Sequence, residues 1–427
     1  MNKIPLSLRE YKEFPGDSDS EKELSKKLKL SKDDHEIAKL LKKENKLDVD
    51  ALTSGIRIKA KQYVGIAPFS QFTVMVMPKI ELNLKEQPEN LAYFIGYAHG
   101  FEKDLIKVLP KIPEAEFEAT RLSRILIELI IMAFVDKCEV LFRQGLVKSY
   151  VTHTENVRFL RGKLLMQLQY RNDLRKNLQF ACEFDELEHD NLENRIILKT
   201  LEVCYLISQD DKIKQNIRRL RHQISGFVSS VPIEMIDFDK ISYNRLNEHY
   251  RLIHKICKLI INNSGIKDIS KFKTPNIVSF FVNMNDVFQD FVSRFLEETL
   301  SKIGYRVSTE QRKRVWYSKG RSRGARTDIL IRKNSQLYIL DTKYKDDIEA
   351  GDLAQIGLYT HEYKKDYGIA ILPTWVGYKD EEWISPVQEK SVYVKRLNIA
   401  EIITLIRNND YESLKSNALY CIGENDT

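Results

Sequence analysis

The chain has 427 residues, of which 30% are charged and 43% belong to the nine hydrophobic types. This composition is typical of a folded globular protein and excludes a mainly disordered chain. At about 100–200 residues per domain, the length predicts two or three domains. The 68 Lys and Arg residues exceed the 61 Asp and Glu residues, for a formal charge of +7. Because this excess is mild, it permits nucleic-acid binding without indicating it.

Cysteine usage and hydropathy exclude the secreted, disulfide-scaffold and membrane classes. Five scattered cysteines form no CxxC pair and have no His at zinc spacing, so we expect reduced core thiols and no zinc site. They are Cys138, Cys182, Cys204, Cys257 and Cys421. The longest apolar stretch, 125–135, is shorter than the roughly 18–20 residues that span a bilayer. Since the N-terminal residues also lack a signal-peptide pattern, we expect a cytoplasmic protein without a membrane partner.

The first two thirds of the chain contain three successive segments that differ in composition and in the spacing of their apolar residues. Residues 17–50 are rich in Lys, Asp, Glu and Ser and predict two short helices, each preceded by a capping serine. Residues 55–80 alternate and are β-branched, which predicts strands. Residues 90–265 predict a helical body with β-insertions, including a long helix that ends near Gly145.

The last 150 or so residues predict a separate α/β domain. Apolar residues at helical spacing predict one amphipathic helix over 274–300. After it we expect an edge strand from 304–307, a β-hairpin, a helix with Asp352 as its N-cap, two further strands and a closing helix.

The hairpin carries the residues that point to chemistry. If Asn334 and Ser335 form a two-residue loop, Asp328 lies opposite Asp341 on the neighbouring strand. Two facing carboxylates repel each other unless a cation lies between them. A hard divalent ion such as Mg²⁺ takes this arrangement, and the Thr342 carbonyl could add a ligand. The pattern therefore predicts a metal site at Asp328, Asp341 and Thr342.

A lysine and a helix complete the candidate site. Lys343 shares the face of Asp341, where it could orient a metal-bound water or stabilise charge on a phosphoryl oxygen. Gln355 and Tyr359, four residues apart, share one face of the following helix. The alternative is structural, because Asp and Lys at strand ends are common and this pattern also arises by chance.

A basic segment precedes the first aspartate. Seven cations crowd it without an acid: Arg312, Lys313, Arg314, Lys319, Arg321, Arg323 and Arg326. Trp316 and Tyr317 lie inside this segment. Basic residues interleaved with aromatic ones suit a phosphate backbone, so we predict contact with double-stranded DNA. The alternative is a mobile, solvated loop.

TDILI…LYILDTKYK followed by DLAQIGLY resembles the PD-(D/E)xK nuclease core with the QxxxY helix of its RecB-like branch. The resemblance assigns catalytic roles to five residues: Asp328, Asp341, Lys343, Gln355 and Tyr359. Two features depart from the family pattern. Thr327 replaces the usual Pro before the first Asp, and the first helix offers Gln289 or Asp290 where many members carry Glu.

Further motifs resemble those of McrC proteins, the nuclease subunits of the McrBC modification-dependent restriction system. VGIAPFSQFTVMVMPKIE, NLAYFIGYAHG, FRQGLVKSYVTHTENVRFLRGKLLM and CEFDELEHDNLENRIILKTL occur in the same order, so the resemblance covers about 50–400. It implies docking of the N-terminal portion on a hexameric AAA+ GTPase, McrB, and stimulation of GTP hydrolysis. It also implies Mg²⁺ on this chain and GTP on the partner. The sequence has no GxxxxGK[ST] motif, in keeping with that division.

Together these patterns predict a multidomain α+β protein. We expect small helices and a β-rich unit over 1–89, a mainly helical partner-docking body with β-insertions over 90–270, and a C-terminal α/β PD-(D/E)xK, restriction-endonuclease-like domain over 271–427. The predicted function is a metal-dependent DNA endonuclease subunit of a GTP-dependent restriction complex. Two alternatives stay open: a non-cleaving subunit that activates the GTPase ring, and a stand-alone RecB-like nuclease.

The polar runs at 158–163 and 184–195 are interpreted as structural. We expect internal ion pairs there, with Asp185 or Glu186 paired to Arg195 or Arg161.

Overall fold

The computed structural model describes eight stretches of the chain, with side chains for all but 119–126, 129 and 310–326. The stretches are 4–80, 90–100, 119–208, 210–264, 279–318, 321–374, 379–385 and 389–424. The chain forms two compact units, one from Met1–Ile130 with Ile277–Thr427 and the other from Ile131–Asn276. Helices and sheets are mixed, and the expected multidomain α+β class is confirmed at that level. The first unit combines the N-terminal segment with the C-terminal α/β segment, which we expected to form separate domains over 1–89 and 271–427.

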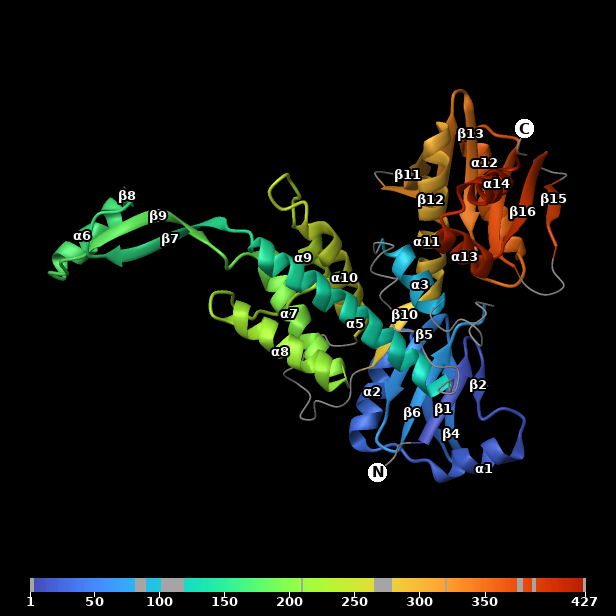
Figure 1. Ribbon diagram of the computed structural model, residues 1–427, viewed down its shortest axis with the longest axis horizontal. Coiled ribbons are helices and arrows are strands. Elements are labelled where there is room, and N and C mark those ends of the chain that lie inside the picture. The colour runs from blue at the N-terminus through green and yellow to red at the C-terminus, as the bar shows by residue number, and fades with distance from the viewer. Residues whose placement is uncertain are drawn as a thin grey trace. The chain divides into compact units, whose positions relative to one another are not determined.

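The N-terminal part of the first unit contains two small sheets (Figure 1). The larger has the order β1-β6-β5-β10, from Ile4–Arg9, Phe72–Met77, Tyr63–Pro68 and Phe280–Asn283. The smaller has the order β2-β4-β3, from Glu13–Phe14, Gly55–Ala60 and Leu47–Leu52. Two helices follow β2, α1 (Asp19–Lys27) and α2 (Lys32–Lys43). Ser18 and Ser31 cap these helices by accepting backbone N–H bonds, as the sequence predicts.

The expected helix over 274–300 is wrong in its first part. Residues 274–278 lie outside the described residues, and Phe280–Asn283 is the strand β10, antiparallel to β5. Helix α11 begins only at Met284, with Asn283 as its N-cap. Phe280, Phe281 and Val282 are all buried, so this apolar run is a fully buried strand, which periodicity alone does not distinguish from a helix. The pairing needs Gly65, because a Cβ there would lie 1.9 Å from the Phe280 carbonyl oxygen.

The C-terminal α/β part of the first unit is built on a six-stranded mixed sheet (Figure 1). Its order is β11-β12-β13-β14-β16-β15. The strands are β11 (Arg306–Ser318), β12 (Arg321–Lys333), β13 (Gln336–Thr342), β14 (Tyr367–Pro373), β15 (Glu381–Ser385) and β16 (Lys390–Leu397). The helices are α3 (Asn90–Ala98), α11 (Met284–Leu300), α12 (Ala350–Glu362), α13 (Ile399–Asn408) and α14 (Tyr411–Ile422), and α3 packs on α11 through Phe94 and Phe291. The expected edge strand and hairpin are confirmed as β11 and β12–β13.

Asp352 is not the N-cap of its helix. Glu349 holds that position, and Asp352 lies three residues later, where its Oδ2 accepts the Glu349 N–H at 3.0 Å. The carboxylate thus still satisfies a backbone donor at the helix start, but from inside the first turn.

The second unit combines a helical body with a β-arm. The helices are the later part of α5 (Ala119–Gln144), α7 (Leu192–Ile207), α8 (Asp211–Ser225), α9 (Met235–Asp239) and α10 (Tyr250–Asn263). The arm contains β7 (Ser149–Val157), β8 (Lys163–Leu164), α6 (Met166–Leu174) and β9 (Phe180–Glu188). Figure 1 shows β7 and β9 running away from the helices of this unit, with α6 and β8 at the far end. This unit contains helices with a β-insertion, whereas α3, which the predicted body over 90–270 also included, belongs to the first unit.

All five cysteines are free and buried, which confirms the expected core thiols. Burial raises the pKa of Cys257 to about 12, so this thiol is inert at neutral pH. Among the described residues, none of the helices combines the length and apolar composition that crossing a bilayer requires.

His254 makes the helical body sensitive to acid. Its ring is buried on α10, with Nδ1 2.9 Å from the Tyr243 hydroxyl and Nε2 3.1 Å from the Glu193 carbonyl. Burial lowers the pKa of His254 to about 4. An unfolded chain takes up this proton below about pH 6.5, whereas the folded chain does not until about pH 4. Stability is therefore retained above pH 6.5 and falls as the pH drops towards 4.

We predict that His254→Gln removes much of this acid sensitivity, which amounts to about 3 kcal/mol over that range. Hydrogen exchange of α10 at pH 7 and pH 5, corrected for the intrinsic exchange rate, measures it. His35→Gln, at an exposed histidine of α2, is the control. An equal loss of protection in His254→Gln and in the unchanged protein would contradict the prediction.

Candidate active site

The hairpin places the two candidate aspartates together. The β12–β13 register runs from Ile329 opposite Leu340 to Lys333 opposite Gln336, which confirms the two-residue loop. Asn334 takes a φ of 52°, the left-handed conformation that such a tight turn requires.

At the other end of this register, Asp328 meets the end of β13. Its Oδ2 accepts the Thr342 backbone N–H at 2.8 Å and the Thr342 hydroxyl at 2.9 Å. These two bonds hold the half-buried Asp328 carboxylate beside Asp341. Thr342 thus orients the first aspartate through its N–H and hydroxyl, and the role of its carbonyl as a metal ligand stays a prediction.

Asp341 is the most constrained charge in the site. Its side chain is fully buried, and Oδ2 lies 2.7 Å from the Lys343 Nζ. Within the described part of the chain, no donor bonds to its Oδ1. Burial, reinforced by the negative charge of Asp328, raises the pKa of Asp341 to about 7. A buried carboxylate with an unpaired oxygen next to a second carboxylate is a donor set that suits a divalent cation.

Lys343 has two close acceptors and one more distant acid around its ammonium group. Besides Asp341, its Nζ donates to the Gln355 Oε1 at 3.1 Å and lies 3.8 Å from the Asp352 Oδ1. Burial lowers the pKa of Lys343, but the charges of Asp341, Asp328 and Asp352 outweigh that effect, so the net pKa is raised. The amine is therefore a charged ammonium group at neutral pH.

Helix α12 supplies the second layer of the site. The Gln355 Nε2 donates to the Tyr359 hydroxyl at 2.5 Å, so the expected shared face of these residues is confirmed. Asp352 belongs to the same face, and its Oδ2 accepts from the Lys345 Nζ at 2.7 Å. Sequence reasoning assigned Asp352 only a capping role, although its spacing of three and seven residues from Gln355 and Tyr359 indicated that face.

A glycine lets α12 approach the sheet. A Cβ added to Gly368 on β14 would lie 2.5 Å from the Ile356 Cγ2 and 2.9 Å from the Thr360 Cγ2. Ile356 and Thr360 immediately follow Gln355 and Tyr359 along the helix. The distance from α12 to β14 therefore sets the reach of Gln355 to the lysine.

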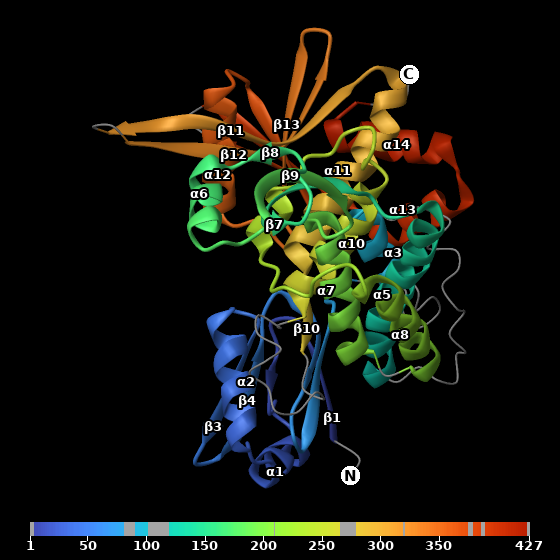
Figure 2. The same cartoon turned by 90° about the vertical axis from the view of Figure 1, so that its left-hand side faces the viewer.

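The basic segment is a β-ribbon and not the loop that the alternative reading expected. Arg312 on β11 pairs with Arg326 on β12, and Trp316 pairs with Arg323. Figure 2 shows β11 and β12 extending beyond the rest of the sheet. Six of the seven predicted DNA-binding positions thus lie on this projecting ribbon. They are Arg312, Lys313, Arg314, Arg321, Arg323 and Arg326. Lys319 lies outside the described residues.

The helix acid of the nuclease pattern stays a prediction. On α11, Gln289 is half-buried and Asp290 is exposed.

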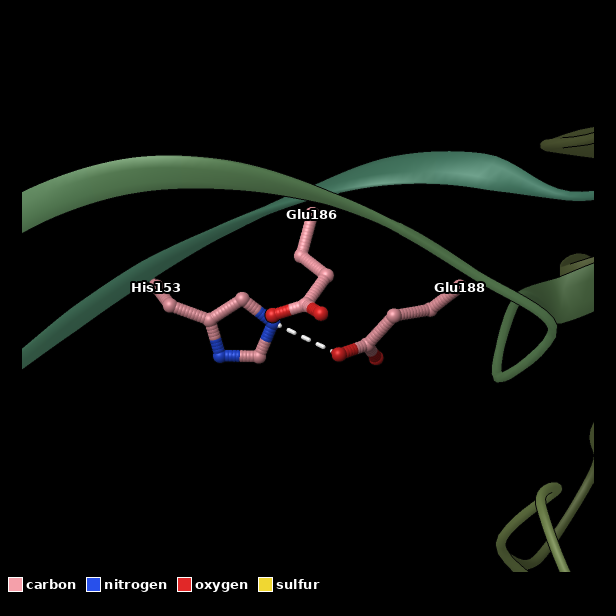
Figure 3. A group of neighbouring side chains, drawn as sticks. All are labelled: His153, Glu186 and Glu188. Atoms are coloured by element: carbon pink, nitrogen blue, oxygen red, sulfur yellow. Dashed lines mark ion pairs between the residues drawn. The ribbon is translucent and has the colours of Figure 1, made fainter. Parts of the chain in front are cut away.

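The arm of the second unit contains a cluster that resembles a metal site in composition. His153 on β7 and Glu186 and Glu188 on β9 place one ligand-type atom each within 4.8 Å of the others (Figure 3). His153 Nε2 lies 2.8 Å from Glu188 Oε1, and Arg161 lies 3.2 Å from Glu186 Oε2. These ion pairs already provide a partner for both carboxylates, so cross-strand pairing explains the cluster.

The expected ion pairs in these polar runs are confirmed in part. Arg161 pairs with Glu186, as predicted. Arg195 instead pairs with Asp190, through contacts of 2.7 and 2.9 Å, because Asp190 comes directly before the helix that carries Arg195. Asp185 accepts from the Thr152 hydroxyl on the opposite strand.

Comparison with known proteins agrees with this architecture. A curated relative, the type IV methyl-directed restriction enzyme EcoKMcrBC of Escherichia coli K12, is 26% identical over 274 residues, covering 61% of this chain and 74% of the relative. The fold matches the McrC chain in a solved assembly of Thermococcus gammatolerans McrB AAA+ hexamers with bound McrC. That match has a TM-score of 0.55 and 20% identity, over 95% of this chain and 100% of the other. The family model of the McrBC 5-methylcytosine restriction system component matches residues 58–372. Since this match spans well over half of the sequence, the chain belongs to the McrBC 5-methylcytosine restriction system component family.

Proposed function

We propose that this chain is an McrC-type subunit that hydrolyses DNA phosphodiesters in a restriction complex and docks on an AAA+ GTPase ring. The observation that carries the proposal is the buried Asp341, which has one oxygen unpaired and lies beside both Asp328 and a charged Lys343. Family membership supports a role in restriction but does not by itself assign a reaction to these residues.

The donor set fits a hard divalent cation. Asp328 and Asp341 would hold Mg²⁺ through carboxylate oxygens, and the Thr342 carbonyl is the third proposed ligand. The chemistry expected of the site with Mg²⁺ bound is polarisation of the scissile phosphate and a lowered pKa of a bound water. Burial first, and then the negative charge of Asp328, raise the pKa of Asp341, and a bound cation would offset both effects.

Lys343 supplies a fixed positive charge at the same place. Asp341 and Gln355 hold its ammonium group from two sides, and Tyr359 holds Gln355. A preorganised ammonium can stabilise the charge that develops on a phosphoryl oxygen without moving during the reaction. The β11–β12 ribbon would then guide the DNA backbone to the site through its basic positions.

The arm is the proposed docking element. It carries a group of exposed apolar side chains, which a monomeric surface rarely shows together. They include Tyr150, Phe159, Leu160, Met166, Tyr170, Leu174 and Leu178, and Phe159 is 82% exposed. The McrC chain of Thermococcus gammatolerans is assembled with McrB AAA+ hexamers, and we extend that kind of partner to this chain.

A regulatory role without cleavage is the second candidate. Many members of the nuclease family carry a glutamate on the first helix, where this chain has Gln289 or Asp290 instead. This departure from the family pattern favours the non-cleaving alternative. The two candidates differ in what the site residues do, so variants of the site separate them.

Asp341→Ala should abolish Mg²⁺-dependent DNA cleavage while leaving stimulation of the partner GTPase intact. The cause is loss of a proposed metal ligand and of the anchor for Lys343. Cleavage of plasmid DNA and GTP turnover by the partner ring measure the two effects. Asp366→Ala, at a highly exposed aspartate of the same α/β part, is the control. If Asp341→Ala cuts DNA normally, the site assignment is wrong.

Gly368→Ala should lower cleavage about tenfold or more, because the added methyl group pushes α12 and Gln355 away from Lys343. Gly351→Ala is the matched control: it lies in the first turn of the same helix, and a Cβ there meets no atom within 4 Å. The two variants are compared in single-turnover DNA cleavage. Equal rates would show that the helix distance does not matter.

Phe159→Ser should weaken stimulation of the partner GTPase at least tenfold, because it removes an exposed apolar contact from the arm. Leu246→Ser provides the control, since Leu246 is 72% exposed in the same unit but lies outside the arm. Titration of each variant into the GTPase measures half-maximal stimulation. Identical titration curves for the two variants would argue against docking through the arm.

A further inference from the structure

The segment after the active-site lysine is anchored to the N-terminal sheet. The Tyr344 hydroxyl donates to the Glu10 Oε2 at 2.7 Å. Glu10 directly follows β1, and the same oxygen accepts the Lys79 backbone N–H at 2.9 Å, just beyond the end of β6. One carboxylate oxygen thus ties the ends of two parallel strands to the residue next to Lys343.

The anchor is a buried carboxyl group. Glu10 is 2% exposed and Tyr344 is 5% exposed. Within the described part of the chain, the second carboxylate oxygen, Oε1, has no hydrogen-bond partner. Desolvation raises the pKa of Glu10 to about 7, which shows how costly its burial is. An apolar residue of similar size would avoid that cost, so packing alone does not account for a glutamate here.

Tyr344 and Lys343 leave the same stretch of backbone in different directions. The Lys343 N–H donates to the Ile371 carbonyl on β14 at 2.9 Å, and its side chain reaches Asp341 and α12. The Tyr344 ring packs against Phe288 of α11 at a centroid distance of 5.9 Å, and its hydroxyl ends on Glu10. The backbone that carries the lysine is therefore fixed from the sheet on one side and from the N-terminal strands on the other.

Lys79 reinforces the same anchor. Its Nζ lies 5.1 Å from the Tyr344 ring centroid and 3.1 Å from the Asp346 Oδ1. Arg396 on β16 donates to the Asp346 carbonyl at 2.5 Å. The 343–346 segment thus has contacts from both the N-terminal sheet and the nuclease-like sheet.

We propose that Glu10 is a positioning residue for Lys343, so that the N-terminal β-unit is part of the scaffold of the active site. Glu10 acts through Tyr344 and does not touch the reacting atoms. The inference rests on the proposed nuclease function. It adds a residue more than 300 positions away in the sequence, outside every motif that predicts the site.

Steady-state DNA cleavage by the full chain with its partner ring tests the proposal. Glu10→Ala should lower kcat about tenfold with little change in KM for DNA, because a misplaced lysine affects chemistry more than binding. Glu10→Gln should restore most of the rate, since its amide oxygen can accept both hydrogen bonds. Tyr344→Phe should match Glu10→Ala, and the double variant should be no worse than either. Glu13→Ala, at an exposed glutamate of β2, is the control.

Three further measurements separate positioning from folding and from absence of nuclease activity. Thermal unfolding and GTPase stimulation should be unchanged in Glu10→Ala, and hydrogen exchange over 342–345 should be faster. A normal kcat overturns the proposal. The proposal is also overturned if Glu10→Ala and Glu10→Gln both lower the unfolding temperature and both weaken GTPase stimulation. If the protein without substitutions cuts no DNA, the proposed nuclease function fails. In that case the anchoring role is tested by hydrogen exchange alone, and it is overturned if Glu10→Ala does not change the exchange rate over 342–345.

Discussion

The buried Asp341 is the constraint on which the rest of the site depends. Its carboxylate is shielded from water, faces the charge of Asp328 and has one oxygen without a hydrogen-bond partner among the described residues. Such a group is stable only if cations offset it, and Lys343 provides one of them at 2.7 Å. The lysine is in turn held charged by the acids around it. Neither residue would have its properties without the other.

The surrounding fold fixes the geometry of this charge pair. A tight turn at Asn334 sets the register that brings Asp328 to the end of β13. Gly368 allows α12 to pack closely enough for Gln355 to reach the lysine. The N-terminal sheet reaches the same place from another direction, through Glu10 and Tyr344. Three separate packing interactions therefore converge on one short segment.

The second unit follows a different principle. Its helical body buries apolar side chains, whereas its arm exposes them: Phe159 and Leu178 are more than four fifths exposed. Antiparallel backbone pairing of β7 and β8 with β9 holds the arm together, and exposed ion pairs such as Arg161 with Glu186 lie on its surface. Apolar exposure of this kind fits the proposed role of the arm as a surface that a partner covers. The arm belongs to one compact unit and the candidate active site to the other.

The sequence by itself determined the local features: the β12–β13 hairpin and its register, the shared face of Gln355 and Tyr359, and the caps at Ser18 and Ser31. These follow from alternation, helical spacing and turn chemistry, all of which act over a few residues. Tertiary structure alone decided that Phe280–Asn283 is a strand, that Asp352 faces Lys343 and that Glu10 supports Tyr344. The physical reason is that burial and long-range pairing depend on distant segments, such as β5 for β10, whose proximity no local pattern encodes.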